Sequence, residues 1–142
     1  MNFEINDLDL FDLISERNLM IRKVTEELWN SSNDIYISNS EWFIIARIYN
    51  KNPTISSINK QVNITRQATH KFIRSLESKG LVEVNQVTHN KKEKCIRLTT
   101  LGEACYEKNE SLKAGLEKKI ANQIDREKLD VFKEILKLDW GI

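Results

Sequence analysis

The sequence predicts a mainly α-helical fold of the α+β class, and three observations lead to this prediction. Only 4 Gly and 1 Pro occur in 142 residues, so few breaks and long helices are expected. Apolar residues recur at three- and four-residue steps along most of the chain, which is the spacing of an amphipathic helix. One segment after Gly80 changes to a period of two, which predicts a single β-hairpin.

The first two predicted helices have recognisable ends. Apolar spacing indicates an amphipathic helix over about residues 8–29, and a polar cluster follows it. The second helix begins at Ser38, because Glu41 three residues later completes a capping-box signature. Pro53 marks where this helix has stopped, since proline removes a backbone donor and disfavours helix in the residue before it.

A helix-turn-helix is predicted next. A short helix over residues 56–61 leads to a turn at Asn63, and Thr65 is a good N-cap for a helix over residues 65–79. Gly80 supplies the left-handed residue that commonly follows a helix. Two helices joined by so tight a turn are typical of a helix-turn-helix.

The period-two segment completes this module. Alternating apolar residues predict strands over about residues 81–84 and 95–98, around a polar and basic tip at residues 88–93. A hairpin with a basic tip directly after a helix-turn-helix is a wing. The predicted fold class is therefore a winged helix-turn-helix, and Thr99 is expected to cap the helix that follows.

The terminal helices are expected to form a dimer. A long apolar seam over residues 101–124, and a last helix after a break near Asp125, flank a module that already has its own core. The simplest use of these seams is to pack on one another and on a second subunit; the alternative is a purely intramolecular bundle. The predicted organisation is one domain, residues 1–142, with an N-terminal dimerisation helix at 1–36, a winged-helix lobe at 37–99 and C-terminal dimerisation helices at 100–142.

Charge is distributed unevenly, although the formal net charge of the chain is only +1. Residues 60–97 contain nine Lys or Arg and three Glu, a net charge of +6. Residues 1–34 contain eight Asp or Glu and three Lys or Arg, a net charge of −5. A clustered positive patch is typical of phosphate binding, and the alternative is a solvated helix face.

The helix expected over residues 65–79 gathers hydrogen-bonding side chains in its first turns. The candidate DNA-contacting residues are Thr65, Arg66, Gln67, Thr69, His70, Lys71 and Arg74. A recognition helix presents its N-terminal part to the major groove, where Arg can bridge guanine O6 and N7 and Gln can pair with adenine. Lys71 and Arg74 can equally hold phosphates. For any single residue, ordinary solvent exposure is the alternative.

The expected wing supplies a second set of candidates, which can reach the flanking minor groove or backbone. They are His89, Asn90, Lys91, Lys92 and Lys94. Lysine favours point-charge contact with phosphate over the planar insertion that arginine makes in narrow grooves. An exposed histidine such as His89 is more often solvated than functional.

Catalytic and metal-binding motifs are missing from the sequence. It contains no P-loop, GxGxxG, GxSxG, CxxC or HExxH, so we predict no enzyme activity, no metal and no cofactor. Cys95 and Cys105 lie on apolar seams, which favours buried, inert thiols over the alternative of a thiol-based enzyme or redox switch. No apolar run approaches the roughly 18 residues that span a membrane, and the acidic start excludes a signal peptide. We therefore predict a cytoplasmic protein.

These residues resemble the MarR family of winged-helix regulators. The resemblance begins with Ile37-Ser38-x-x-Glu41-Trp42, continues through PTISSINKQVNITRQATHKFIRSLESKGLVEV at residues 53–84, and ends with IRLTTLGE at residues 96–103. It covers most of residues 37–106, whereas the terminal helices match in length and placement only. Many members carry Asp-x-Arg at the wing tip, where this chain has Asn90 and Lys92. Peroxide-sensing members place a cysteine in the first helix, and this chain has none there.

The resemblance implies a homodimer that binds pseudo-palindromic double-stranded DNA as a repressor. It also implies a small phenolic or lipophilic effector bound between the dimer helices and the DNA-binding lobe. Such a pocket would involve Trp29, Tyr36, Trp42 or Tyr106, although aromatic residues at helical spacing are usually core. The alternative function is a winged-helix module that binds protein and no DNA.

Overall fold

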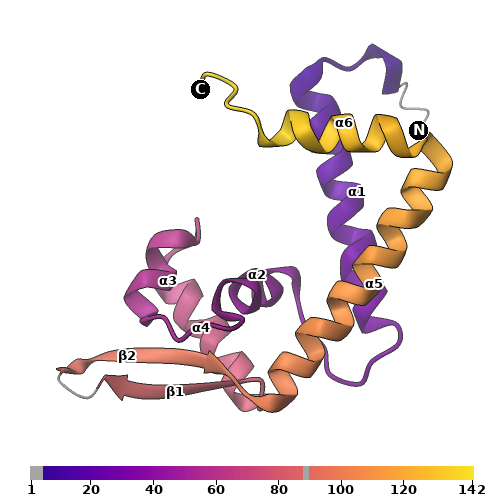
Figure 1. Cartoon of the computed structure of the whole chain (residues 1–142). Helices are drawn as coiled ribbons and strands as arrows, with labels where there is room; N and C mark the ends of the chain where they lie inside the picture. The colour runs from indigo at the N-terminus through magenta and orange to yellow at the C-terminus, as the bar shows by residue number, and fades with distance from the viewer. Residues whose placement is uncertain (1–4, 88–89) are drawn as a thin grey trace.

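The computed structural model describes residues 5–87 and 90–142, with side chains at residues 5–87 and 93–142 (Figure 1). It has the mainly helical fold that the sequence predicts, with six α-helices and one two-stranded sheet in these ranges. The elements in chain order are η1 (Ile5–Asp7), α1 (Leu10–Asn30), α2 (Asn39–Ile48), α3 (Ile55–Gln61), α4 (Arg66–Ser78), β1 (Val82–Val87), β2 (Asn90–Leu98), α5 (Thr100–Ile124) and α6 (Arg126–Lys137).

The helices begin where short polar side chains can cap them. Ser38 and Glu41 form the predicted capping box at the start of α2, with each side chain bonded to the other residue's backbone amide. Thr65 caps α4 and Thr99 caps α5, and each hydroxyl accepts a hydrogen bond from the backbone amide three residues later. Gly80 has a φ of +75°, so the predicted left-handed residue after α4 is confirmed.

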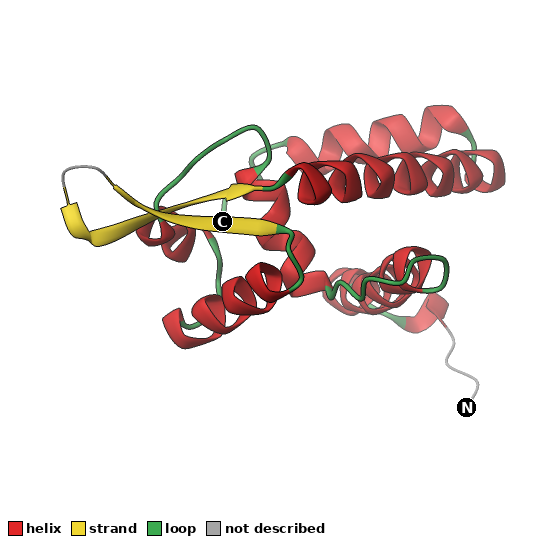
Figure 2. Cartoon of the chain, turned by 90° about the horizontal axis from the view of Figure 1, so that it is seen from below, coloured by secondary structure: helices red, strands yellow, loops and turns green. Residues whose placement is uncertain are grey.

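The hairpin is antiparallel and its strands are longer than predicted. Val82 pairs with Leu98 at its base, and Gln86 pairs with Lys94 before the register shifts. Val87 then pairs with Asn90, so residues 90–93, which we expected in the tip, belong to β2. Polar, charged residues can extend a two-stranded ribbon because only backbone groups make its ladder. Both views show the hairpin projecting away from the terminal helices (Figures 1 and 2).

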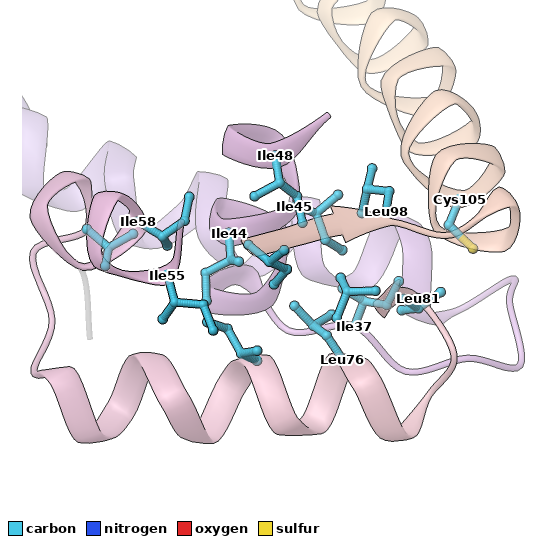
Figure 3. Close-up of a cluster of buried hydrophobic side chains, with 14 of the residues drawn as sticks. Ile37, Ile44, Ile45, Ile48, Ile55, Ile58, Leu76, Leu81, Leu98 and Cys105 are labelled. Carbon is cyan, nitrogen blue, oxygen red and sulfur yellow. The ribbon is translucent and has the colours of Figure 1, made fainter. Parts of the chain in front are cut away.

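The core of the lobe lies where α2, α3, α4, the hairpin and the start of α5 meet (Figure 3). Ile44, Ile45 and Ile48 of α2 are fully buried, and Leu76 of α4 is equally enclosed. The backbone amide of Ile96 donates to the carbonyl of Pro53 at 2.9 Å, which ties β2 to the segment before α3. The helix-turn-helix and the wing therefore form one packed unit.

The terminal helices leave much of their apolar surface uncovered. The helix α5 runs from the hairpin to the distant end of the molecule, where α6 begins (Figure 1). The helix α5 packs against α1. Even so, Phe11 of α1 and Phe132 of α6 are 72% and 53% exposed. Further exposed apolar side chains of α1, α6 and the C-terminal tail include Leu10, Leu19, Met20, Ile21, Val131, Leu136, Leu138 and Trp140. Of the helices in the described ranges, none has the length and apolarity needed to cross a membrane.

Candidate nucleic-acid interface

The helix α4 is built to present one face and bury the other. Its N-cap hydroxyl, Thr65 Oγ1, accepts from the Ala68 amide at 3.0 Å, which satisfies one of the free donors of the first turn. Ile73 and Leu76 are 3% and 0% exposed and fix the buried face against the core. The N-terminus of such a helix carries a partial positive charge that attracts phosphate.

The opposite face of α4 is polar and largely exposed. Thr65, Arg66, Gln67, Lys71 and Arg74 are exposed and His70 is half-buried. Positions 66, 70 and 74 are four residues apart, so they form one row along the helix. The structure therefore brings six of the seven predicted recognition-helix residues to the surface.

Thr69 is the exception, and its prediction as a DNA-contacting residue is wrong. Its side chain is fully buried, and its hydroxyl donates to the carbonyl of Thr65 at 3.1 Å. It lies four residues before Ile73 on the buried face. Its polarity misled the prediction, because a threonine hydroxyl can be satisfied by its own helix backbone.

An open hollow of about 830 Å³ separates α4 from the wing. Arg66, His70 and Arg74 line it from α4, and Lys94 lines it from β2. Asn59 of α3 also faces it. The acidic side chains at its border are Glu77 and Glu93. The hollow thus brings Arg66 and Arg74 of α4 together with Lys94 of β2, which lies at least 20 residues later in the sequence.

The wing contributes Lys94 as its one described candidate. Lys94 is exposed on β2. The structure places Asn90, Lys91 and Lys92 on the same strand, where only their backbone is described, and His89 lies outside the described residues. At the base of the hairpin, Arg97 forms an exposed ion pair with Glu83 at 2.8 Å.

The four aromatic residues predicted for an effector pocket do not form one group. Trp29 is 2% exposed and packs edge-on against Trp42, with ring centroids 5.2 Å apart. Tyr106 packs instead against Tyr49, at 4.2 Å. Tyr36 is exposed, and its hydroxyl donates to Glu26 at 2.9 Å.

Two buried polar atoms, one on α2 and one on α5, have no hydrogen-bond partner among the described residues. They are Trp42 Nε1, a donor on α2, and Asn109 Oδ1, an acceptor on α5, and the two helices contact each other. A buried polar group without a partner is costly. Sequence reasoning missed Asn109, although a polar residue four positions after Cys105 on the apolar seam of α5 is the signal that would have found it.

Glu41 is a second residue whose role the sequence did not reveal. Its side chain is 4% exposed and forms an ion pair of 2.8 Å with Lys79, at the C-terminal end of α4. Burial opposes the charged form, but hydrogen bonds from Lys79 and Ser38 and the charge of Lys79 outweigh it, so the pKa of Glu41 lies below its ordinary value. The capping-box pattern predicted only the contact with Ser38.

The two cysteines do not form an obvious reactive site. Cys95 is half-buried and Cys105 is buried, and burial raises the pKa of the Cys105 thiol against a weaker opposing effect of Lys108. A raised pKa reduces the thiolate fraction that nucleophilic chemistry needs. Among the described residues, no three or more His, Cys, Asp or Glu side chains gather in a way that could hold a metal ion.

Comparison with known proteins finds a matching family model and solved structures with a similar fold. The model of the MarR family matches residues 37–94, and no curated protein matches the chain. The fold is similar to that of Streptococcus pneumoniae FabT in complex with DNA, with a TM-score of 0.77 and 19% identity over 89% of this chain and 90% of that one. It is also similar to wild-type apo MarR from E. coli, with a TM-score of 0.77 and 20% identity over 92% and 96% of the two chains.

A third similar structure is MepR, a transcription regulator of the Staphylococcus aureus multidrug efflux pump MepA. Its TM-score is 0.73 at 20% identity, over 91% of this chain and 94% of that one. At these identities the likeness establishes the fold, and the family match covers residues 37–94. The resemblance seen in the sequence is thus confirmed: residues 37–94 match the MarR family, and the chain has the winged helix-turn-helix fold of the MarR-family regulators.

Proposed function

We propose that this chain is a homodimeric transcription regulator that binds a specific, pseudo-palindromic DNA site and represses from it. The observation that carries the proposal is the row of Arg66, His70 and Arg74 on α4, which faces Lys94 of the wing across the open hollow. A recognition helix in the major groove and a wing beside it leave one DNA strand between them. Arg66, Arg74 and Lys94 on the lining suit the phosphates of that strand, and they outnumber the two acidic residues there.

The residues of α4 would divide the work of reading and holding DNA. Thr65, Arg66 and Gln67 are exposed at the N-terminal end, where a recognition helix meets base edges. Lys71 and Arg74 lie one and two turns further along and suit phosphate contacts. Lys94 adds a phosphate contact from the wing, and Asn90, Lys91, Lys92 and His89 remain proposed contacts around it.

The homodimer is supported by the uncovered apolar surface of α1 and α6. Phe11, Ile21 and Phe132 are each more than half exposed in the single chain. An exposed apolar patch of this kind marks an interface, and a two-fold pair of lobes would match a two-fold DNA site. Two recognition helices would then lie roughly 34 Å apart, one turn of DNA. A single sedimenting species with the mass of one chain would contradict the dimer.

The effector would bind near Trp42 and Asn109. A phenol hydroxyl can accept a hydrogen bond from Trp42 Nε1 or donate one to Asn109 Oδ1, which are unpartnered within the described structure. We expect phenol to change the tryptophan fluorescence and weaken DNA binding, and toluene, which lacks the hydroxyl, to do so less. Asn109→Leu should reduce the difference between the two compounds, because only the bond to Trp42 Nε1 is then left to favour phenol. Equal responses to phenol and toluene in the unaltered protein would contradict this assignment.

The test of DNA binding is selection from random-sequence duplexes, followed by titration of the selected duplex and a scrambled one. We expect clear preference for the selected duplex and a steep fall in affinity with salt, because about 0.9 counterions are released for each neutralised phosphate. Binding that is flat between low and physiological salt would refute the proposal. A chain that retards no duplex would instead be a protein-interaction module.

Two substitutions separate the proposed roles. Arg66→Ala should reduce affinity for the selected duplex far more than for the scrambled one, because it removes a base contact. Lys94→Ala should weaken both duplexes alike and lower the salt slope by about 1. Lys118→Ala is the control, since it removes the same charge from an exposed position on α5. An equal loss on both duplexes for Arg66→Ala would refute its role as a base reader.

A further inference from the structure

We propose that Glu41 is a positioning residue for the recognition helix. Its buried carboxylate attaches the C-terminal end of α4 to α2 and so fixes the angle at which the N-terminal end of α4 meets DNA bases. The inference rests on the proposed function, because it concerns how well α4 reads a sequence. It assigns Glu41 a task beyond capping α2.

The carboxylate of Glu41 makes more contacts than a capping box needs. Its Oε1 accepts from the Ser38 amide at 3.0 Å, from the Ser38 hydroxyl at 3.0 Å and from Lys79 Nζ at 2.9 Å. Its Oε2 accepts from the Ser75 hydroxyl at 3.1 Å and from Lys79 Nζ at 2.8 Å. A capping box accounts only for the bond to the Ser38 amide. One whole oxygen, Oε2, is bonded to α4 alone.

The two partners on α4 make a two-point attachment. Ser75 and Lys79 are four residues apart, so both lie on one side of the helix, one turn from each other. Apolar contacts such as those of Leu76 are non-directional, whereas hydrogen bonds to a carboxylate specify direction. Lys79 also makes a cation–π contact with the ring of Tyr36, with its Nζ 5.5 Å from the ring centroid. The attachment therefore defines both the rotation and the tilt of α4.

A small change in the tilt of α4 at this attachment becomes a large displacement of the side chains that would meet the DNA. Nine residues separate Ser75 from Arg66, which is roughly 13 Å along the helix at about 1.5 Å per residue. A tilt of about 5° at Ser75 then moves Arg66 by roughly 1 Å. Hydrogen bonds to base edges fail over such a distance, because their donor–acceptor distances fall in a range of only about 0.5 Å. Phosphate attraction changes little over the same distance, since it is long-ranged.

Stability alone does not explain this largely buried ion pair, in which the side chains of Glu41 and Lys79 are 4% and 24% exposed. Removing two charges from water costs much of what their attraction returns, so apolar side chains of similar size often stabilise a fold equally well. The best-attested use of such a pair is to specify one arrangement of elements. Here the arrangement specified is that of the proposed reading helix on α2.

The experiment compares Glu41→Gln with a matched control, Glu83→Gln. Both remove one acidic charge from an ion pair, but the Glu83–Arg97 pair is exposed and lies at the base of the hairpin. Affinities for the selected and scrambled duplexes are measured at a temperature where circular dichroism shows each variant fully folded. We expect Glu41→Gln to lose at least tenfold in affinity for the selected duplex and to bind the scrambled duplex like the unaltered protein. Glu83→Gln should keep the ratio of the two affinities.

The outcomes are distinct. An unchanged ratio for folded Glu41→Gln, or an equal loss on both duplexes, overturns the positioning role while leaving the proposed function intact. An unaltered protein that shows no sequence preference overturns the proposed function, and this inference with it. If Glu41→Gln fails to fold, Ser75→Ala takes its place, because it removes one bond to α4 and leaves the carboxylate paired with Lys79. A Ser75→Ala variant with the full ratio would likewise overturn the inference.

Discussion

Gly102 is the position where the structure makes the sharpest demand on residue type. It lies in the first turn of α5, pressed against the turn that follows α4. A Cβ at this position would overlap the carbonyl oxygen of Leu81 and lie 3.2 Å from Leu98 Cδ2. That carbonyl accepts from the Thr99 amide at 3.0 Å, so it cannot move without loss of the bond. We therefore expect Gly102→Ala to destabilise the fold.

Three contributions give the expected loss of unfolding free energy in Gly102→Ala. Overpacking of a well-packed site costs about 1–3 kcal/mol, and the upper end applies here because backbone rather than a side chain must move. The strained hydrogen bond adds about 1 kcal/mol. The better helix propensity of alanine returns about 1 kcal/mol. The net loss is about 3 kcal/mol, which lowers Tm by roughly 10 °C for a chain of this size.

Thermal unfolding followed by circular dichroism at fixed protein concentration measures this loss. Gly115→Ala is the matched control in the same helix, because nothing lies within 4 Å of its added Cβ. It should gain about 1 kcal/mol from helix propensity and raise Tm. Gly102→Ala with a Tm equal to or above that of the unaltered protein would refute the reasoning.

Three further expectations concern α4 and its support. Because the pKa of Glu41 in the folded state lies below its ordinary value, the charged carboxylate stabilises the fold fully above the ordinary range of a glutamate, and this stabilisation is lost as the pH falls through the lower folded pKa. Urea unfolding at several pH values should therefore show that the difference in unfolding free energy between the unaltered protein and Glu41→Gln narrows as the pH falls below that range. Thr65→Ala should cost about 1 kcal/mol in the same assay, through the lost N-cap. Thr69→Val should leave DNA affinity unchanged in titration, since the buried hydroxyl faces its own helix; a large loss would restore Thr69 as a contact.

The order and type of the elements could be predicted because local chemistry determines them. Ser38, Thr65 and Thr99 are caps whose side chains act within three residues, and Gly80 adopts the left-handed backbone that its position after α4 requires. Such interactions are fully contained in short sequence patterns. The polar row of α4 was predictable for the same reason, since a period of four places residues 66, 70 and 74 together.

The features that sequence reasoning missed depend on contacts between distant segments. The Glu41–Ser75 bond joins residues 34 positions apart, and no local pattern distinguishes a solvated Ser75 from a bonded one. Thr69 was assigned to the wrong face because polarity was taken as a sign of exposure, whereas the helix backbone satisfies its hydroxyl. The predicted wing tip included residues 90–93, which belong to β2, because backbone pairing in a two-stranded ribbon tolerates charged residues.

The position of α2 explains how the proposed effector site and the proposed recognition helix α4 can be coupled. Trp42, which packs against Trp29 of α1, follows directly after Glu41, which bonds to the end of α4. A helix backbone is stiff over two adjacent residues, so a displacement of Trp42 by a ligand must also displace Glu41. Because the carboxylate is enclosed and fully bonded, it cannot absorb that displacement without moving Ser75 and Lys79. An effector at the junction of α1, α2 and α5 would therefore act on base reading through α2, without contact with α4 itself.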